Sequence, residues 1–145
     1  EQEREEFLQE FEKERDETFV GFCVMGGIFS EGIDLKEDRL IGVVIVGTGL
    51  PMVCTEQELL KGYFEKTNQK GFDYAYQYPG MNKVMQAAGR VIRTMEDEGI
   101  ILLLDDRFLK REYQELFPRE WWPHQIVNRG NVGKAIRDFW KERKR

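Results

Sequence analysis

Residues 40–46, Leu-Ile-Gly-Val-Val-Ile-Val, form a nearly unbroken apolar run, and this run decides the fold class. Two more runs of the same kind lie at residues 19–25 and 100–104. Apolar runs without alternation are typical of parallel strands that helices cover on both faces. The sequence therefore predicts three interior parallel strands.

The segments between and around these runs have apolar residues at helical spacing. This spacing predicts five helices, at residues 3–15, 56–66, 81–96, 108–116 and 132–142. Strands that alternate with helices favour a layered α/β domain. Thr55 can cap the second helix, with Glu58 completing a capping box. The stretch Tyr78-Pro79-Gly80 marks a break before the third helix.

The length of the chain suits one domain. It has 145 residues, of which 41% are apolar, enough for one buried core and too few for two ordinary domains. We expect a single domain over residues 1–145, with a helix at its edge in residues 1–17. Residues 118–131 are predicted to be an irregular connection whose tryptophans pack on the core, and residues 132–145 a C-terminal helix with a basic tail. Because the chain opens on Glu1 inside a charged helical pattern, we expect a piece of a larger protein.

Charge and composition limit the function classes. No run is long enough to span a membrane and no apolar leader is present, so we expect no membrane partner and a cytoplasmic location. Cys23 and Cys54 lack the spacing of a metal or redox site and are expected to be buried or idle thiols. The net charge of −5 predicts that this chain binds DNA weakly alone.

Residues 86–94, Gln-Ala-Ala-Gly-Arg-Val-Ile-Arg-Thr, carry two arginines at helical spacing. On the helix predicted for residues 81–96, Gln86, Arg90 and Arg93 share one face, and Gly89 removes bulk between the cations. The opposite face is expected to hold Val84, Ala88, Val91 and Met95. Two fixed guanidinium groups suit a phosphate anion. The alternative is a surface helix whose arginines are simply solvated.

The loop after the first predicted strand holds small residues, a hydroxyl group and carboxylates. Backbone amides near Gly32 could hold phosphate, and Glu31 or Asp34 could orient a ribose hydroxyl or a cation. The alternative is a glycine turn in which Asp34 caps a short helix. Ligands gather at the carboxyl ends of parallel strands, so this loop is a candidate site.

Two other motifs are weaker. Gly133-Lys134 is followed by Ala135, so it fails as a phosphate-binding P-loop. Asp105 and Asp106 end an apolar strand as magnesium-binding acids do, but without a P-loop upstream a structural role is expected: pairing with Arg107, or capping a helix near Phe108. Rings in residues 72–78 either stack with DNA bases or pack, as an extended segment, on their own domain.

Taken together, four motifs resemble superfamily 2 helicases of the XPD/DinG-like group. Residues 29–35, Phe-Ser-Glu-Gly-Ile-Asp-Leu, resemble motif V, and residues 86–94 resemble motif VI. The resemblance continues through residues 47–51 and 103–108 and covers residues 19–118. It implies a RecA-like three-layer α/β domain with a mainly parallel sheet covered by helices on both faces and without its own P-loop. The chain would then be the C-terminal part of the second RecA-like motor domain of a bacterial ATP-dependent DNA helicase.

The resemblance also implies roles for single residues. Arg93 would be the arginine finger, with Arg90 beside it. Gln86, Gly89, Glu31, Gly32 and Asp34 would serve the nucleotide site, and Ser30 and Thr48 would contact DNA. ATP and Mg²⁺ would be bound mainly by the first RecA-like domain of the same parent chain, with no metal held by this fragment.

The same resemblance implies that the parent moves along single-stranded DNA in the five-prime to three-prime direction, and that the isolated domain does not hydrolyse ATP. Two alternatives stay open from the residues. One is a non-catalytic helicase-like module that binds DNA or protein, and the other is an unrelated nucleotide-binding α/β domain.

Overall fold

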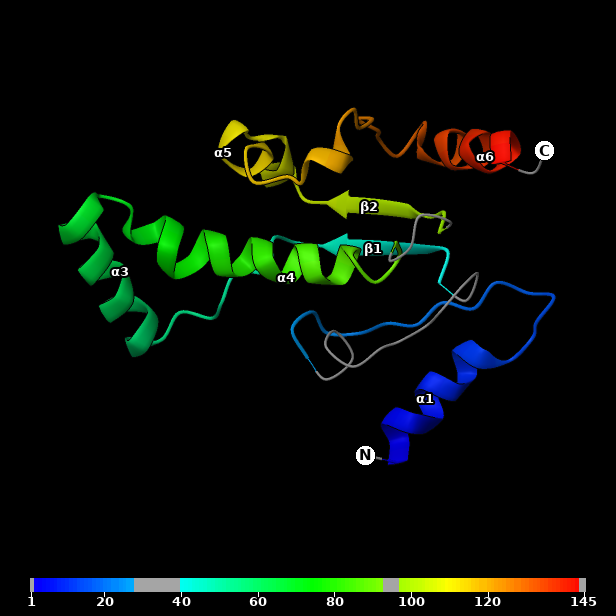
Figure 1. Cartoon of the computed structure of the whole chain (residues 1–145), viewed down its shortest axis with the longest axis horizontal. Helices are drawn as coiled ribbons and strands as arrows, with labels where there is room; N and C mark the ends of the chain where they lie inside the picture. The colour runs from blue at the N-terminus through cyan, green and yellow to red at the C-terminus, as the bar shows by residue number, and fades with distance from the viewer. Residues whose placement is uncertain (1, 28–39, 93–96, 144–145) are drawn as a thin grey trace. The chain divides into compact units, whose positions relative to one another are not determined.

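The computed structural model describes residues 2–27, 40–92 and 97–143. The chain divides into two compact units, Glu1–Gln114 and Glu115–Arg145, and each is described by itself. The elements of the first unit run in the order α1 (Gln2–Glu12), β1 (Gly42–Val46), α3 (Thr55–Asn68), α4 (Tyr78–Ala88), β2 (Ile100–Leu104) and α5 (Arg111–Gln114) (Figure 1). The second unit holds a short 3₁₀ turn (Arg119–Trp121) and α6 (Val132–Arg143).

The centre of the first unit is a parallel pair of strands. β1 and β2 run side by side, with Gly42 opposite Ile100 and Val46 opposite Leu104 (Figure 1). Parallel neighbours need a long crossover connection, and α3 and α4 lie within it. The α/β fold class, the two strands and their parallel direction are therefore confirmed.

The strand predicted at residues 19–25 is wrong. These residues run as an irregular segment, and the side chain of Phe22 is 93% exposed. An apolar run becomes a strand only where a neighbouring backbone can share its hydrogen bonds, and in the described part of the chain β1 and β2 pair with each other. The segment instead packs on α1, where the rings of Phe11 and Phe19 meet edge to face at 4.8 Å.

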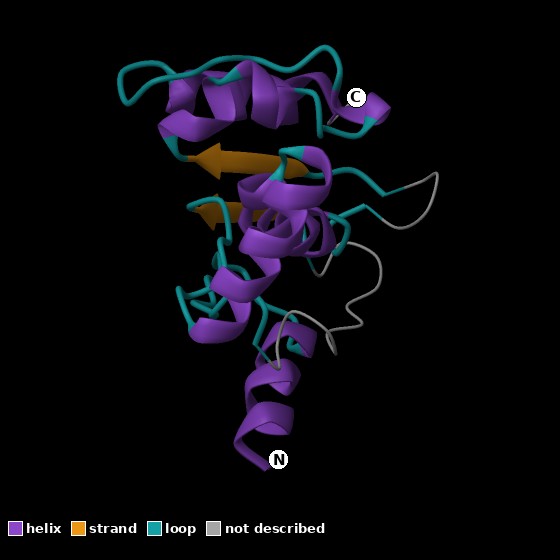
Figure 2. Cartoon of the chain, turned by 90° about the vertical axis from the view of Figure 1, so that its left-hand side faces the viewer, coloured by secondary structure: helices purple, strands orange, loops and turns teal. Residues whose placement is uncertain are grey.

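Helix α4 covers one face of the sheet (Figure 2). Met81, Val84 and Ala88 on this helix are buried, as is Ile45 on β1. The other face of β1 carries Val44 and Val46, and Val46 is 74% exposed. In the described residues, the second covering layer that the apolar runs predict is therefore not seen over β1.

The helices α1, α3 and α6 begin and end close to their predicted limits, but the predicted capping box of α3 is wrong. Thr55 is the first helical residue and Cys54 is the N-cap, with no side-chain cap hydrogen bond to a described residue. Glu58 instead accepts a hydrogen bond of 2.6 Å from the hydroxyl of Tyr76, which holds the pKa of Glu58 below its usual value. The Glu58 carboxylate, which the capping box would require, thus links α3 to the helical segment that holds Tyr76.

The aromatic stretch before α4 is helical, so the prediction of an extended segment is wrong. Asp73–Gln77 forms a π-helical turn that runs directly into α4, with the amide of Tyr78 donating to the carbonyl of Asp73. Pro79 lies in the first turn of α4, directly after the π-helical turn. Because proline lacks an N–H group, it would interrupt the hydrogen bonds of a regular α-helix, and the wider turn lies at this point of the chain.

The rings of this stretch pack on their own domain, which was one of the two alternatives. Phe64 of α3 stacks on Tyr74 with 4.4 Å between ring centroids, and Phe72 stacks on Tyr76 at 5.6 Å. Tyr76 is buried, whereas Phe72 and Tyr74 stay partly exposed. Offset ring pairs of this kind add stability beyond the area that they bury.

The helix predicted at residues 108–116 is divided in two. A 3₁₀ turn (Asp106–Leu109) precedes the single turn of α5. Asp105 caps the 3₁₀ turn by accepting from the amide of Arg107, and both carboxylate oxygens also bind the Arg107 guanidinium, at 2.9 and 2.7 Å. The predicted structural role of Asp105 is confirmed.

The second unit holds a small cluster of rings. Phe117 contacts Trp121 at 5.2 Å, and Trp122 contacts His124 at 4.5 Å. Trp122 is half exposed, so the tryptophans pack with their sequence neighbours and are only partly covered. On α6 the Arg143 guanidinium lies 3.8 Å from the ring centroid of Phe139.

Two glycines let the loop after β1 touch α4. A Cβ atom on Gly80 would lie 2.5 Å from the carbonyl oxygen of Thr48 and 3.1 Å from the amide nitrogen of Leu50. A Cβ atom on Gly49, whose φ is +65°, would lie 2.8 Å from the carbonyl oxygen of Gly80. Both obstacles are backbone atoms, which cannot rotate away as a side chain can.

We predict that Gly80→Ala destabilises the chain. A helical alanine gains about 1 kcal/mol over glycine, but forcing a methyl group into packed backbone costs about 1–3 kcal/mol, so the loss prevails. The matched control is Gly62→Ala in α3, where an added Cβ meets no atom within 4 Å and stability should rise. Chemical denaturation measures both, and a Gly80→Ala chain as stable as Gly62→Ala would contradict the contact.

The Asp105–Arg107 pair predicts a dependence of stability on pH. Arg107 lowers the pKa of Asp105 to about 2 in the folded chain, against about 3.9 unfolded. The pair therefore stabilises the fold fully above the unfolded value, and this contribution is lost as the pH falls through the folded value.

The gap in unfolding free energy between the wild type and Asp105→Asn should accordingly shrink between pH 7 and pH 3, as urea titrations would show. Asp106→Asn, at the exposed neighbouring carboxylate, should show a smaller gap at pH 7. A gap for Asp105→Asn that stays constant down to pH 2 would contradict the assignment.

Candidate functional site

Two segments meet beside α4. The loop after β1 touches the helix at Gly80, as described above. Met25 reaches the same loop, because a Cβ atom on Gly49 would lie 3.2 Å from its Cε atom. A Cβ atom on Gly26 would lie 3.1 Å from the side chain of Lys83 on α4. Helix α4 thus contacts both the loop at the carboxyl end of β1 and the turn at residues 25–26.

This gathering is the observed part of the predicted site. Ligands of parallel sheets bind at the carboxyl ends of the strands. Glycines at positions 26, 47 and 49 all have positive φ, a conformation that brings backbone amides to the surface of a turn without side-chain bulk. Backbone of this kind can approach a phosphate closely.

Thr48 lies within the contact and is 1% exposed. Its hydroxyl oxygen is buried, with no hydrogen-bond partner among the described residues. The neighbouring Gly47 lies outside this close contact, since an added Cβ there would meet no atom within 4 Å.

Helix α4 ends at Ala88, so the prediction of a helix over residues 81–96 is wrong for residues 89–92, and residues 93–96 lie outside the described residues. The amide of Arg90 donates to the carbonyl of Ala87, and that of Val91 donates to Ala88, which closes the helix with tight three-residue steps. Gly89 weakens the helix here. Val91 then turns inward and is buried beside Gly99, at the start of β2.

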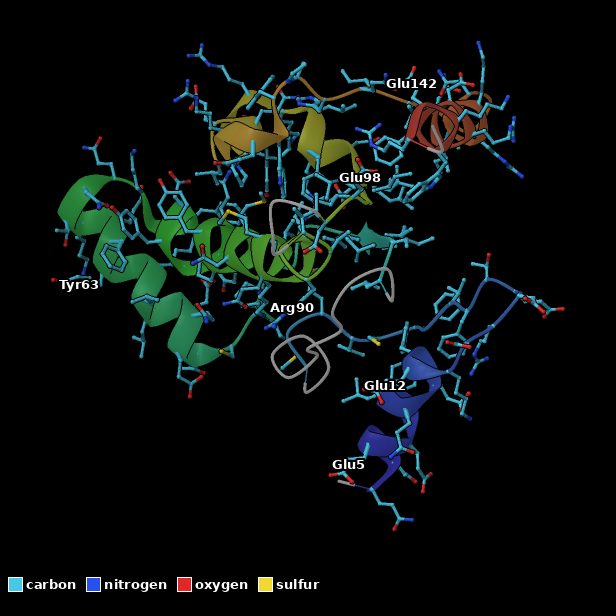
Figure 3. The ribbon with its side chains drawn as sticks, turned by 45° about the vertical axis from the view of Figure 1, so that its right-hand side comes forward. Glu5, Glu12, Tyr63, Arg90, Glu98 and Glu142 are labelled. Carbon is cyan, nitrogen blue, oxygen red and sulfur yellow. The ribbon has the colours of Figure 1, made fainter. Side chains whose placement is uncertain are left out.

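The face expected to be apolar is confirmed for Val84, Ala88 and Val91, which are all buried. Gln86 lies on the last turn of α4 and is exposed. Arg90 lies in the turn beyond the helix, half-buried, and interacts with other groups of the chain (Figure 3). A cation just past a helix C-terminus also stabilises the helix dipole, which gives Arg90 a structural role as well.

The remaining predicted site residues lie outside the described residues: Ser30, Glu31, Gly32, Asp34, Arg93, and Met95 of the apolar face. The structure brings Gln86, Gly89 and Arg90 together at the end of α4 and places Thr48 near its start. Gln86 and Arg90 do not share one helix, because α4 ends at Ala88, and the row that would include Arg93 stays a prediction.

Sequence reasoning missed Gly80 as a residue of the site. The sequence predicts a break before the helix at Gly80, whereas this residue lies inside α4 and provides the contact with the loop. The available signal was a glycine one residue before the apolar series at positions 81, 84 and 88, since a glycine within a helical pattern often marks a close backbone approach.

At the carboxyl end of β2, Asp105 is bound by Arg107 and is therefore engaged in the fold. The described residues contain no group of three or more side chains placed to hold a metal ion. Both cysteines are free thiols, and Cys23 is exposed, so of the two expected alternatives, buried or idle, burial does not apply to Cys23. Within the described ranges no helix combines the length and apolarity needed to cross a membrane.

Comparison with known proteins identifies the family. The family model of the helicase C-terminal domain matches residues 1–125. The chain is 32% identical over 126 residues to the ATP-dependent DNA helicase chl1 of Schizosaccharomyces pombe, covering 81% of this chain and 15% of that protein. It is also 32% identical over 113 residues to the ATP-dependent DNA helicase YoaA of Haemophilus influenzae, covering 76% of this chain and 17% of the relative.

A third relative is the regulator of telomere elongation helicase 1 homolog of Caenorhabditis elegans, 30% identical over 133 residues, which covers 83% of this chain and 13% of that protein. The chain thus spans less than a fifth of the length of each of these relatives. The matched region includes the parallel strands, α4 and the residues gathered around it. The chain therefore belongs to the helicase C-terminal domain family of XPD/DinG-like DNA helicases.

Proposed function

We propose that this chain is the C-terminal part of the second RecA-like motor domain of an ATP-dependent DNA helicase and that it completes the ATP site of its parent protein. Its partner is the first RecA-like domain of the same polypeptide, and its track is single-stranded DNA. The observation that supports this most is the gathering of the β1 loop and the residue 25–26 turn on α4, the helix that leads into residues 86–94.

The chemistry suits a shared ATP site. Phosphoryl transfer spreads negative charge over the transferred group, and catalysis depends mostly on positioning and electrostatic stabilisation. This chain offers cations at residues 90 and 93 but no complete P-loop motif. ATP and Mg²⁺ are therefore held mainly by the first domain, while Arg93 approaches the γ-phosphate from across the cleft and Arg90 and Gln86 support it.

The proposed contacts with DNA come from the loops at the carboxyl end of the sheet. Ser30 and the loop around Thr48 face the DNA backbone, and Glu31, Gly32 and Asp34 join this track to the nucleotide site. Because the Thr48 side chain is buried, the proposal assigns the contact to the backbone of its loop. The contact between Gly49 and Gly80 then joins the DNA loop to the helix that precedes the arginines.

Arg93→Ala in the full-length parent should abolish DNA-stimulated ATP hydrolysis and unwinding while leaving the fold intact. Arginine fingers of related enzymes contribute about 10³–10⁵ in turnover. A coupled ATPase assay measures the effect, with circular dichroism to check folding. Arg129→Ala, at an exposed arginine of the second unit, is the control and should behave as the wild type. Wild-type hydrolysis by Arg93→Ala would refute the role.

The chain by itself should not turn over ATP, because the triphosphate-binding loop belongs to the partner domain. Steady-state phosphate release from the purified chain, with and without a DNA oligonucleotide, tests this. Robust turnover, or micromolar ATP binding by the chain alone, would favour an unrelated nucleotide-binding domain. A parent that binds DNA without hydrolysing ATP would favour the non-catalytic module.

A further inference from the structure

A pocket of about 370 Å³ lies in the first unit, away from Arg90 and the end of α4. Its lining comes from three places: Leu50 in the loop after β1, Phe72, Asp73 and Gln77 on the π-helical turn and the residue before it, and residues 107–113 after β2. The segments that follow the carboxyl ends of both strands therefore line it, at the edge of the sheet where ligands bind.

The lining includes two buried side chains that are fixed in place. Gln77 and Tyr113 are each 4% exposed. The Gln77 amide nitrogen donates to the carbonyl of Glu112 at 3.0 Å, and the Tyr113 ring packs edge to face on Phe108. These contacts order that part of the lining before any ligand arrives, which reduces the entropy lost on binding.

Phe72 lines the same pocket and is accessible. The ring is 45% exposed and is supported by its stack on Tyr76, which is buried. A supported ring with exposed surface is the kind of group on which a nucleic-acid base stacks, and every base has a flat face to offer. Tyr63, on α3, is more exposed at 62% but does not line the pocket (Figure 3).

The charges of the pocket cancel, and Lys110 is the cation in the lining that remains accessible. Arg107 is held by Asp105, whereas Lys110 is exposed and forms no ion pair within 4 Å in the part of the chain that the structure describes. Asp73 and Glu112 also line the pocket, so two cations are balanced by two carboxylates. A pocket without net positive charge opposes a polyanionic triphosphate. Because Arg107 is paired with Asp105, the phosphate contact rests on Lys110, and the carboxylates can accept from base amino groups.

We propose that this pocket binds one nucleotide unit of a single DNA strand, with the base against Phe72 and the phosphate beside Lys110. Its volume lies at the lower end of small-ligand pockets and accommodates one nucleotide. The inference rests on the proposed function, since it takes DNA to be the track of the parent helicase. It adds Phe72 and Lys110 as contact points, two residues that lie outside the helicase-like motifs.

The test is the affinity of the full-length parent for a fluorescent oligothymidylate, measured by anisotropy without ATP. Phe72→Ala should weaken binding about five-fold or more, and Phe72→Tyr, which keeps the ring, should bind as the wild type. Lys110→Ala should weaken binding and reduce its salt dependence. Tyr63→Ala is the matched control, an exposed ring outside the pocket, and should leave the affinity unchanged.

A photoreactive thymine in the oligonucleotide should also crosslink to the peptide that contains Phe72, and this crosslink should be lost in Phe72→Ala. Equal affinities for wild type, Phe72→Ala and Lys110→Ala would overturn the inference, as would competition by free thymidine monophosphate as effective as that by the oligonucleotide. If DNA-stimulated ATP hydrolysis persists while these variants bind normally, the pocket assignment alone fails. If the wild type shows no such hydrolysis, the helicase proposal fails first.

Discussion

The contact between backbone atoms at Gly49 and Gly80 is the constraint on which the rest of the site depends. Here the loop after β1 and helix α4 approach so closely that a Cβ atom on Gly80 would lie 2.5 Å from a carbonyl oxygen. The same approach buries Thr48 and lets Met25 reach the loop. The end of β1 and helix α4 are therefore held together by backbone atoms, and residues 25–26 join them through the side chains of Met25 and Lys83.

The sequence predicted those parts of the fold that follow from local or periodic signals. The strands at residues 42–46 and 100–104 are continuous apolar runs, and both form. The link between Asp105 and Arg107 was also predictable, because the two residues are two positions apart and share one turn. Each of these features depends on residues that lie close together along the chain, or on burial alone.

The failures have a common physical origin in partners that are distant in sequence. Residues 19–25 are as apolar as the two strands, but apolarity does not supply the neighbouring backbone that a strand requires. Glu58 has the correct spacing for a capping box, yet it binds Tyr76, eighteen residues along the chain. The end of α4 depends on Val91 turning inward beside Gly99, a contact that helical periodicity does not contain. For the candidate site, the sequence indicated the residue types and the edge of the sheet, whereas the close approach of Gly80 required the structure.

The π-helical turn at Asp73–Gln77 sets the angular relation between the two ends of one continuous helix. Each residue of an α-helix advances the chain by about 100°, so a turn that is one residue wider rotates everything after it by about that angle. Phe72 and Gln77 are directed to one pocket, and Val84 and Ala88 face the sheet, because this offset lies between them. One additional residue in a helical turn thus lets one helix direct some side chains to the pocket and others to the sheet. A regular α-helix of the same sequence would place these side chains in a different relative orientation.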